Sequence, residues 1–65
     1  MYYILERELK RSNITREHLA KIIGTSTSTV SEKMNGKTEF KLDECQKIKK
    51  ALGSPLPLDE LFRTD

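Results

Sequence analysis

Hydroxyl side chains are concentrated in one short segment of the chain. Five consecutive hydroxyl residues occupy positions 25–29, and Ser31, Glu32 and Asn35 follow them. Short polar side chains of this kind suit recognition by hydrogen bonding, such as contact with the edges of DNA bases. A flexible linker or a phosphorylation site is the alternative, but Gly24 before the run and Val30 after it favour a helix cap and a recognition helix.

The remaining residue types exclude several other kinds of chemistry. Cys45 is the only cysteine, so it cannot form an internal disulfide, and with His18 it cannot supply a four-ligand zinc site. No Ser/His/Asp or paired-carboxylate arrangement stands out, and a chain this short leaves little room for a pocket. We therefore predict no enzyme activity, no catalytic residue, no metal, no cofactor and no small-molecule substrate. His18 is expected to be exposed, and Cys45 to be a core residue without a redox role.

Length and hydropathy indicate a single domain of residues 1–65 in the cytoplasm. A chain of 65 residues is enough for one domain. No apolar run approaches the ~18 residues that a membrane span requires. The apolar start at 1–4 is followed by charges rather than preceded by them, which is unlike a signal peptide. No membrane partner is expected.

The positive charge is unevenly distributed along the chain. Residues 1–37 carry seven Lys or Arg and four acids, whereas residues 38–65 carry five Lys or Arg and six acids. An excess of positive charge in the first half is where a DNA-facing surface would need it. An ordinary mixed surface explains the charges equally well.

The spacing of apolar residues predicts an all-α, compact bundle of about five short helices, without strands. The helices are expected at 2–12, from Thr15 to Gly24, from a cap at 25–26 to about 35, at 41–52 and at 58–63. The side chains predicted to face the core recur at helical spacing: Leu5, Leu9 and Met1 or Tyr2; Leu19, Ala20 and Ile23; Val30 and Met34; Leu42, Cys45, Ile48 and Leu52; Leu58, Leu61 and Phe62.

The second and third predicted helices have the local features of a helix-turn-helix at about 15–35. Thr15 is a good N-cap, and Ala20 is small enough for two helices to cross closely. Gly24 stands where a tight turn needs a positive φ. With Val30 and Met34 placed inward, Ser28, Glu32 and Asn35 fall on the solvent face, and Thr27 lies at the N-terminal tip of the helix.

This segment resembles the lambda repressor and Cro-type (XRE) family of helix-turn-helix regulators. The resemblance is carried by Leu19-Ala20, Gly24, Ser26, Val30 and Asn35-Gly36-Lys37, and it continues through Phe40, Glu44, Ile48 and Ala51-Leu52-Gly53. It implies a five-helix lambda repressor-like fold whose third helix enters the major groove of a double-stranded DNA operator. It further implies a homodimer, formed in solution or only on DNA, and a role as a small Cro-like repressor from a phage or mobile element.

The resemblance also assigns roles to individual residues. Thr27, Ser28 and Glu32 occupy the positions that read bases, and Ser31 lies beside them. Arg16, Thr25, Asn35 and Lys37 are expected to hold the DNA backbone. The chain departs from the family at Arg16, where Gln is frequent, and at Met34, where Glu is frequent. Any buried ion pair that uses this Glu is therefore absent, and packing must replace it.

Three alternatives remain open at this level. Glu32 can accept a hydrogen bond from cytosine, pair locally with Lys33 or Ser28, or repel DNA. Arg16, Asn35 and Lys37 can be ordinary solvated residues. The whole chain can be a protein-interaction module, such as an antirepressor or adaptor, which keeps the fold without binding DNA.

Leu58, Leu61 or Phe62 is the expected contact of the dimer.

Overall fold

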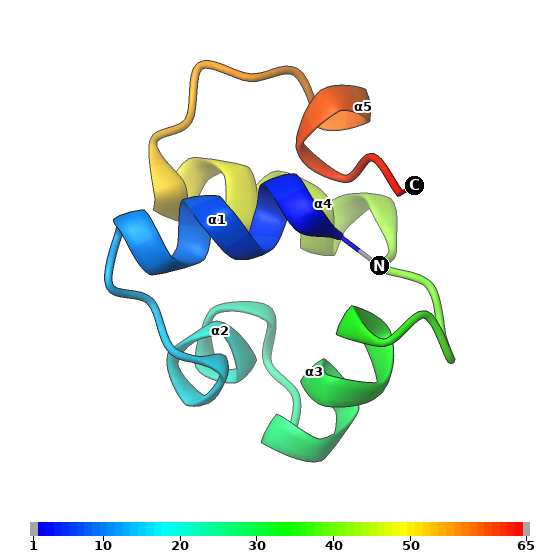
Figure 1. The fold of residues 1–65 in the computed structure, drawn as a ribbon. Helices are drawn as coiled ribbons and strands as arrows, with labels where there is room; N and C mark the ends of the chain where they lie inside the picture. Colours follow the sequence, from blue (N-terminus) through cyan, green and yellow to red (C-terminus); the bar gives the residue numbers. More distant parts are fainter. Residues whose placement is uncertain (1, 65) are drawn as a thin grey trace.

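The computed structural model describes residues 2–64, and this part of the chain contains five helices and no strand. The helices are α1 (Tyr3–Arg11), α2 (Arg16–Ile23), α3 (Thr27–Met34), α4 (Leu42–Leu52) and α5 (Leu58–Leu61). Helices α2 and α3 lie at one end of the molecule and α5 at the other, with α1 and α4 between them (Figure 1). The predicted all-α bundle is confirmed, and Met1, one of two residues proposed to complete the core face of α1, lies outside the described residues.

Single residues determine where the helices begin and end, either by bonding a free backbone N–H or by adopting a left-handed conformation. The Thr15 hydroxyl accepts a hydrogen bond from the His18 N–H at 3.2 Å, which caps α2 as predicted. Gly24 ends α2 in the left-handed conformation at φ 74°, and its N–H donates to the Ala20 carbonyl. Asn13 also has a positive φ, of 57°, between α1 and α2. The cap of α2 and the turn that ends it therefore lie where the sequence predicts.

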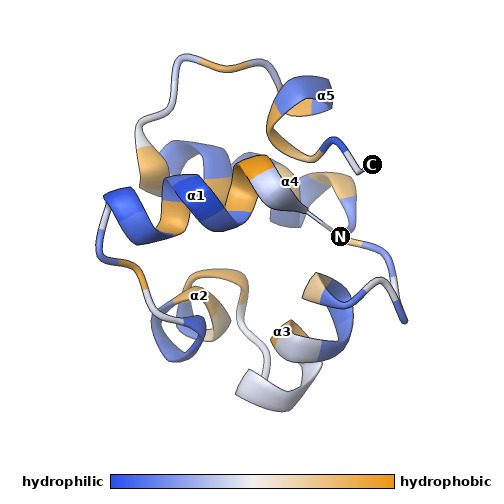
Figure 2. Ribbon diagram, in the orientation of Figure 1, coloured by the Kyte–Doolittle hydropathy of each residue, from blue (hydrophilic) through white to orange (hydrophobic). Residues whose placement is uncertain are grey.

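The core is made of apolar side chains from all five helices. Nine of them are buried: Leu5, Leu9, Leu19, Ala20, Ile23, Val30, Met34, Ile48 and Leu61. Helix α2 packs against both α3 and α4, and α5 packs against α1 and α4. Colouring by hydropathy shows that the first turn of α3 is nearly neutral, between the apolar core and the strongly polar surface (Figure 2). This turn therefore carries uncharged polar side chains, of which Thr27 and Ser28 are exposed.

Two predicted core or contact residues are corrected by the structure. Leu42 is 67% exposed, although it was expected on the apolar face of α4. It lies about 120° around the helix from the buried Ile48, at the first position of α4, where the stripe has already turned away from the core. Leu61 is 0% exposed, so it is a core residue and cannot supply the dimer contact proposed for it.

Three aromatic rings close the end of the molecule that carries the first and last described residues. Phe40 lies 5.3 Å from Tyr2 and 5.3 Å from Phe62 between ring centroids, and all three pairs are edge-to-face. Edge-to-face pairs of this kind add stability beyond the area they bury. The rings join the start of α1, the segment before α4 and the end of α5, and Tyr2 is partly buried against the core.

The left-handed conformation of Gly24 gives a direct test of the turn. Replacing Gly24 with valine should destabilise the protein by about 1–3 kcal/mol, because a β-branched residue resists positive φ. No atom lies within 4 Å of a Cβ built at this position, so the cost is conformational and not a clash. Gly24→Asn is the control, since asparagine tolerates this region and should lose much less. An unchanged urea midpoint for Gly24→Val would show that the turn is built differently.

Candidate nucleic-acid interface

The surface of α3 is set by how the helix packs on α2. Val30 and Met34 are 0% and 1% exposed, which confirms that this side of α3 faces the core. Ser28 and Glu32 are exposed on the opposite side, and Thr27 is exposed at the N-terminal tip of the helix. Three of the four predicted base-reading residues are therefore exposed on α3, two on its outer face and one at its tip.

The hydroxyl run before and within α3 divides into two groups. The Ser26 hydroxyl accepts from the Thr29 N–H at 3.2 Å and lies 2.9 Å from the Thr29 hydroxyl. Ser26 is therefore the N-cap of α3, one of the two hydroxyl residues that the sequence offered for this cap. Within residues 2–64 no hydrogen bond is formed by the side chains of Thr27 and Ser28. These two hydroxyls are available to a ligand.

Arg16 and Ser31 are brought together, although they were assigned to different roles. One Arg16 nitrogen donates to the Ser31 hydroxyl at 3.1 Å, and the other lies 3.6 Å from the Glu6 carboxylate. Arg16 thus connects α1, α2 and α3 while keeping 42% of its side chain exposed. Ser31 is half-buried beneath this contact, so it is less free to reach a base than Thr27 or Ser28.

The segment after α3 presents the other predicted backbone contacts. Asn35 is the C-cap of α3, and Gly36 follows at φ 83°. The Lys37 N–H donates to the Glu32 carbonyl at 2.9 Å, which folds the segment back onto α3. The side chains of Asn35 and Lys37 are exposed, and Thr25 is half-buried at the other end of α3.

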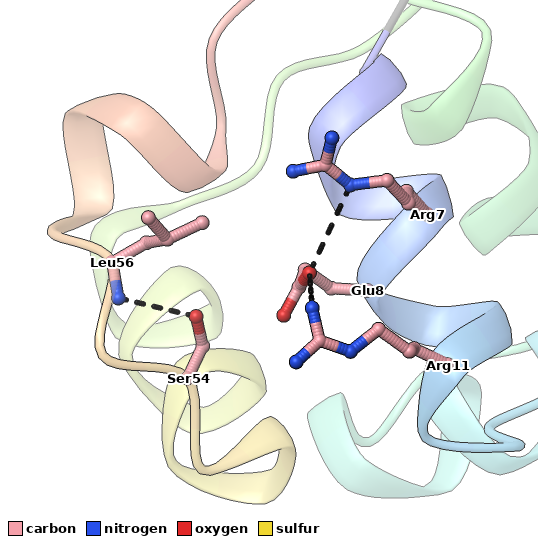
Figure 3. A network of polar contacts seen from close by, with 5 residues as sticks. All are labelled: Arg7, Glu8, Arg11, Ser54 and Leu56. Carbon is pink, nitrogen blue, oxygen red and sulfur yellow. Dashed lines mark hydrogen bonds and ion pairs between the residues drawn. The ribbon is translucent and has the colours of Figure 1, made fainter.

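The charge distribution differs from the sequence-based prediction. Glu8 is only 7% exposed and its carboxylate lies 3.3 Å from Arg11 and 3.9 Å from Arg7. Figure 3 shows these two arginines flanking Glu8 on the side of α1 that faces Ser54 and Leu56. Lys33 is 7% exposed and is paired with an acid. Three of the seven basic residues in 1–37 are therefore engaged by acids away from the exposed face of α3, because a linear count takes no account of where the chain folds.

The pair formed by Lys33 and Glu44 is a feature that the sequence analysis missed. Lys33 was considered as a partner of Glu32, but its ammonium group lies 2.9 Å from the Glu44 carboxylate. Within residues 2–64 Glu32 forms no ion pair. At 100° per residue, Lys33 lies 60° from Val30 and Glu44 lies 40° from Ile48. Opposite charges beside two apolar stripes are the signal that could have identified the pair.

Glu44 gives a prediction for the dependence of stability on pH. Burial alone raises the pKa of Glu44, but hydrogen bonds from the Lys41 N–H and from Lys33, with the Lys33 charge, outweigh it and hold the pKa below its ordinary 4.5. The stabilisation is therefore complete at neutral pH and is lost as the pH falls below 4.5 toward the folded-state pKa. Urea midpoints measured from about pH 7 to about pH 3 should fall less steeply for Glu44→Gln than for the wild type. Identical slopes would show that Glu44 does not carry this dependence.

The residues with reactive side chains do not form a second site. Burial raises the pKa of the Cys45 thiol, with the Glu44 carboxylate adding to the effect, so the thiol is protonated at neutral pH. His18 is exposed, as predicted. Among residues 2–64 no group of three or more His, Cys, Asp or Glu is placed to hold a metal ion. No described helix has the length and apolar character of a membrane span.

Comparison with known families agrees with this geometry. A family model described as helix-turn-helix matches residues 5–59, which include α2, the turn and α3. The family is one of DNA-binding regulators and not a family of enzymes. Comparisons of the chain with curated proteins and with solved structures find no match.

Proposed function

Because the chain belongs to the XRE/lambda repressor-like family of helix-turn-helix DNA-binding regulators, we propose that it binds one double-stranded DNA operator sequence-specifically by placing α3 in the major groove. The observation that carries this proposal is the arrangement of α3. It buries Val30 and Met34 in the core and leaves Thr27, Ser28 and Glu32 exposed.

The residues of this face divide by the part of DNA that they can reach. We propose that Thr27, Ser28 and Glu32 contact base edges, since recognition helices use their N-terminal residues for this purpose. Ser31 acts beside them, held by Arg16. Asn35 and Lys37 at one end of α3, Thr25 at the other, and Arg16 at the start of α2 contact phosphates. These contacts position the helix without reading sequence.

The biological role and assembly extend the same proposal. We propose a Cro-like repressor of phage or mobile-element type, with residues 1–65 forming one helix-turn-helix domain. A homodimer would match an operator with two-fold symmetry. Its apolar contact would come from Leu58 and Phe62, which are half-buried, and from Tyr3, which is 60% exposed and lines a surface hollow with Arg63.

Selection of bound duplexes from a random pool tests this function. The expected result is an enriched motif with two half-sites, bound more weakly as salt increases. Sedimentation of the complex then gives the number of chains per duplex, with two expected. Failure to enrich any duplex at every salt concentration would contradict DNA binding and favour a protein-interaction module. A monomer on a site without symmetry would contradict the dimer alone.

A further inference from the structure

Lys33 is the one charged side chain of α3 that is buried in the described part of the chain. Its ammonium group donates to the Glu44 carboxylate at 2.9 Å and to the Glu39 carbonyl at 3.1 Å. The two paired side chains are 9% and 12% exposed. The Phe40 ring centroid lies 5.9 Å from the ammonium nitrogen. Lys33 is therefore held from three directions, by residues that all lie beyond α3 in the chain.

A single carboxylate oxygen connects these contacts to the next helix. The Glu44 oxygen that accepts from Lys33 also accepts from the Lys41 N–H at 2.9 Å, at the start of α4. The last turn of α3, the segment 35–41 and the first turn of α4 are thus joined at one point. Segment 35–41 is held near its start by the Lys37 N–H, which donates to the Glu32 carbonyl, and at its end by the bond from the Lys41 N–H to Glu44.

We propose that Lys33 and Glu44 form a positioning pair that places Asn35 and Lys37 against the DNA backbone. Neither Lys33 nor Glu44 touches DNA in this arrangement. Removing a buried partner leaves a charge without compensation, so the surrounding segment must rearrange. The segment that rearranges carries the proposed phosphate contacts, whereas Thr27 and Ser28 lie at the opposite end of α3. The pair therefore controls affinity for every duplex and leaves the base preference set by Thr27 and Ser28 unchanged. This inference rests on the proposed function.

Double-mutant cycles separate this role from a purely structural one. Lys33→Met is combined with Lys37→Ala and, separately, with Ser28→Ala, and binding to the selected duplex and to an unrelated duplex is measured at several salt concentrations. Circular dichroism fixes a temperature at which every variant is folded. Lys47→Met is the matched control, because Lys47 is an exposed lysine on α4. It corrects for the loss of one positive charge.

The positioning role predicts a specific pattern of coupling. Lys33→Met should weaken binding to both duplexes about tenfold and reduce the salt slope by roughly 1, as loss of a phosphate contact does. Adding Lys37→Ala should then weaken binding less than about twofold, whereas adding Ser28→Ala should keep its full effect on the selected duplex. Lys47→Met should change binding by less than about threefold.

Several outcomes would overturn the inference. They are full additivity of Lys33→Met with Lys37→Ala, a change caused by Lys33→Met in the base preference that depends on Ser28, or an effect no larger than that of Lys47→Met. If Lys33→Met does not fold, Glu44→Gln takes its place, since its amide oxygen still accepts from the Lys41 N–H. The same coupling to Lys37→Ala is then expected, and additivity overturns the role. A wild-type chain that binds no duplex instead refutes the proposed function itself.

Discussion

Replacing Leu19 with alanine should unfold a large fraction of the molecules at physiological temperature. Leu19 is 0% exposed and belongs to the core between α2 and its neighbours. Large-to-small changes at such sites cost about 2–5 kcal/mol, because transfer free energy and packing are both lost. A single core in a chain of this size supplies roughly 3–5 kcal/mol in total. The substitution is therefore expected to remove most of the stability, as urea and thermal denaturation would show.

Leu42→Ala is the matched control for this experiment. It makes the same chemical change in a side chain that is 67% exposed, so its effect on the free energy of unfolding should be within about 0.5 kcal/mol. Equal losses for the two variants would contradict both the core and the corrected position of Leu42. A large loss for Leu42→Ala would mean that α4 is rotated from the orientation described, and a small loss for Leu19→Ala would mean the same for α2.

Ser28→Ala should reduce binding to the preferred operator by about 1–3 kcal/mol and have little effect on unrelated duplexes. The Ser28 hydroxyl is exposed near the N-terminus of α3, where recognition helices contact bases. Lys37→Ala should instead weaken binding to all duplexes alike and reduce the salt slope by roughly 1. Both variants are measured on a set of single-base operator variants at two salt concentrations. Ser12→Ala, an exposed serine after α1, controls for loss of a hydroxyl.

Glu32→Gln decides between the alternatives left open for this residue. Since Lys33 is paired with Glu44, local neutralisation of Glu32 by Lys33 is ruled out. If Glu32 accepts from cytosine, the variant should change the preferred base at one position per half-site. If Glu32 only repels phosphate, affinity should rise on every sequence. The assignment of roles fails if Ser28→Ala keeps the wild-type preference while Lys37→Ala alters it.

The local part of the fold could be predicted from the sequence because it depends on near neighbours. Thr15 caps α2 through a hydroxyl three residues from its donor, and Gly24 is a residue type suited to positive φ. The spacing of Val30 and Met34 fixes which side of α3 is buried and so which residues are exposed. These features explain why the helix-turn-helix and the face of α3 were predicted before its tertiary contacts were known.

The remaining features depend on contacts between segments distant in the chain. The contact between Lys33 and Glu44 joins residues 11 positions apart, and the one between Arg16 and Ser31 joins residues 15 apart. The periodicity of apolar residues shows which face of its own helix a residue occupies, but it does not show which other helix packs against that face. For the same reason, Arg7 and Arg11 were counted toward a DNA-facing half although they flank Glu8. Spacing alone also does not show where the buried face of a helix ends, as the exposure of Leu42 at the start of α4 illustrates.

Mapping amide chemical-shift changes on the folded chain during titration with the selected duplex tests the central claim most directly. The claim is that α3 and its flanking segments form the DNA-binding surface. The largest chemical-shift changes are expected at Arg16 and residues 25–37, and small changes are expected at α5 and at the side of α1 that carries Arg7 and Arg11. Changes concentrated on α5 and residues 2–4, with α3 unaffected, would contradict it.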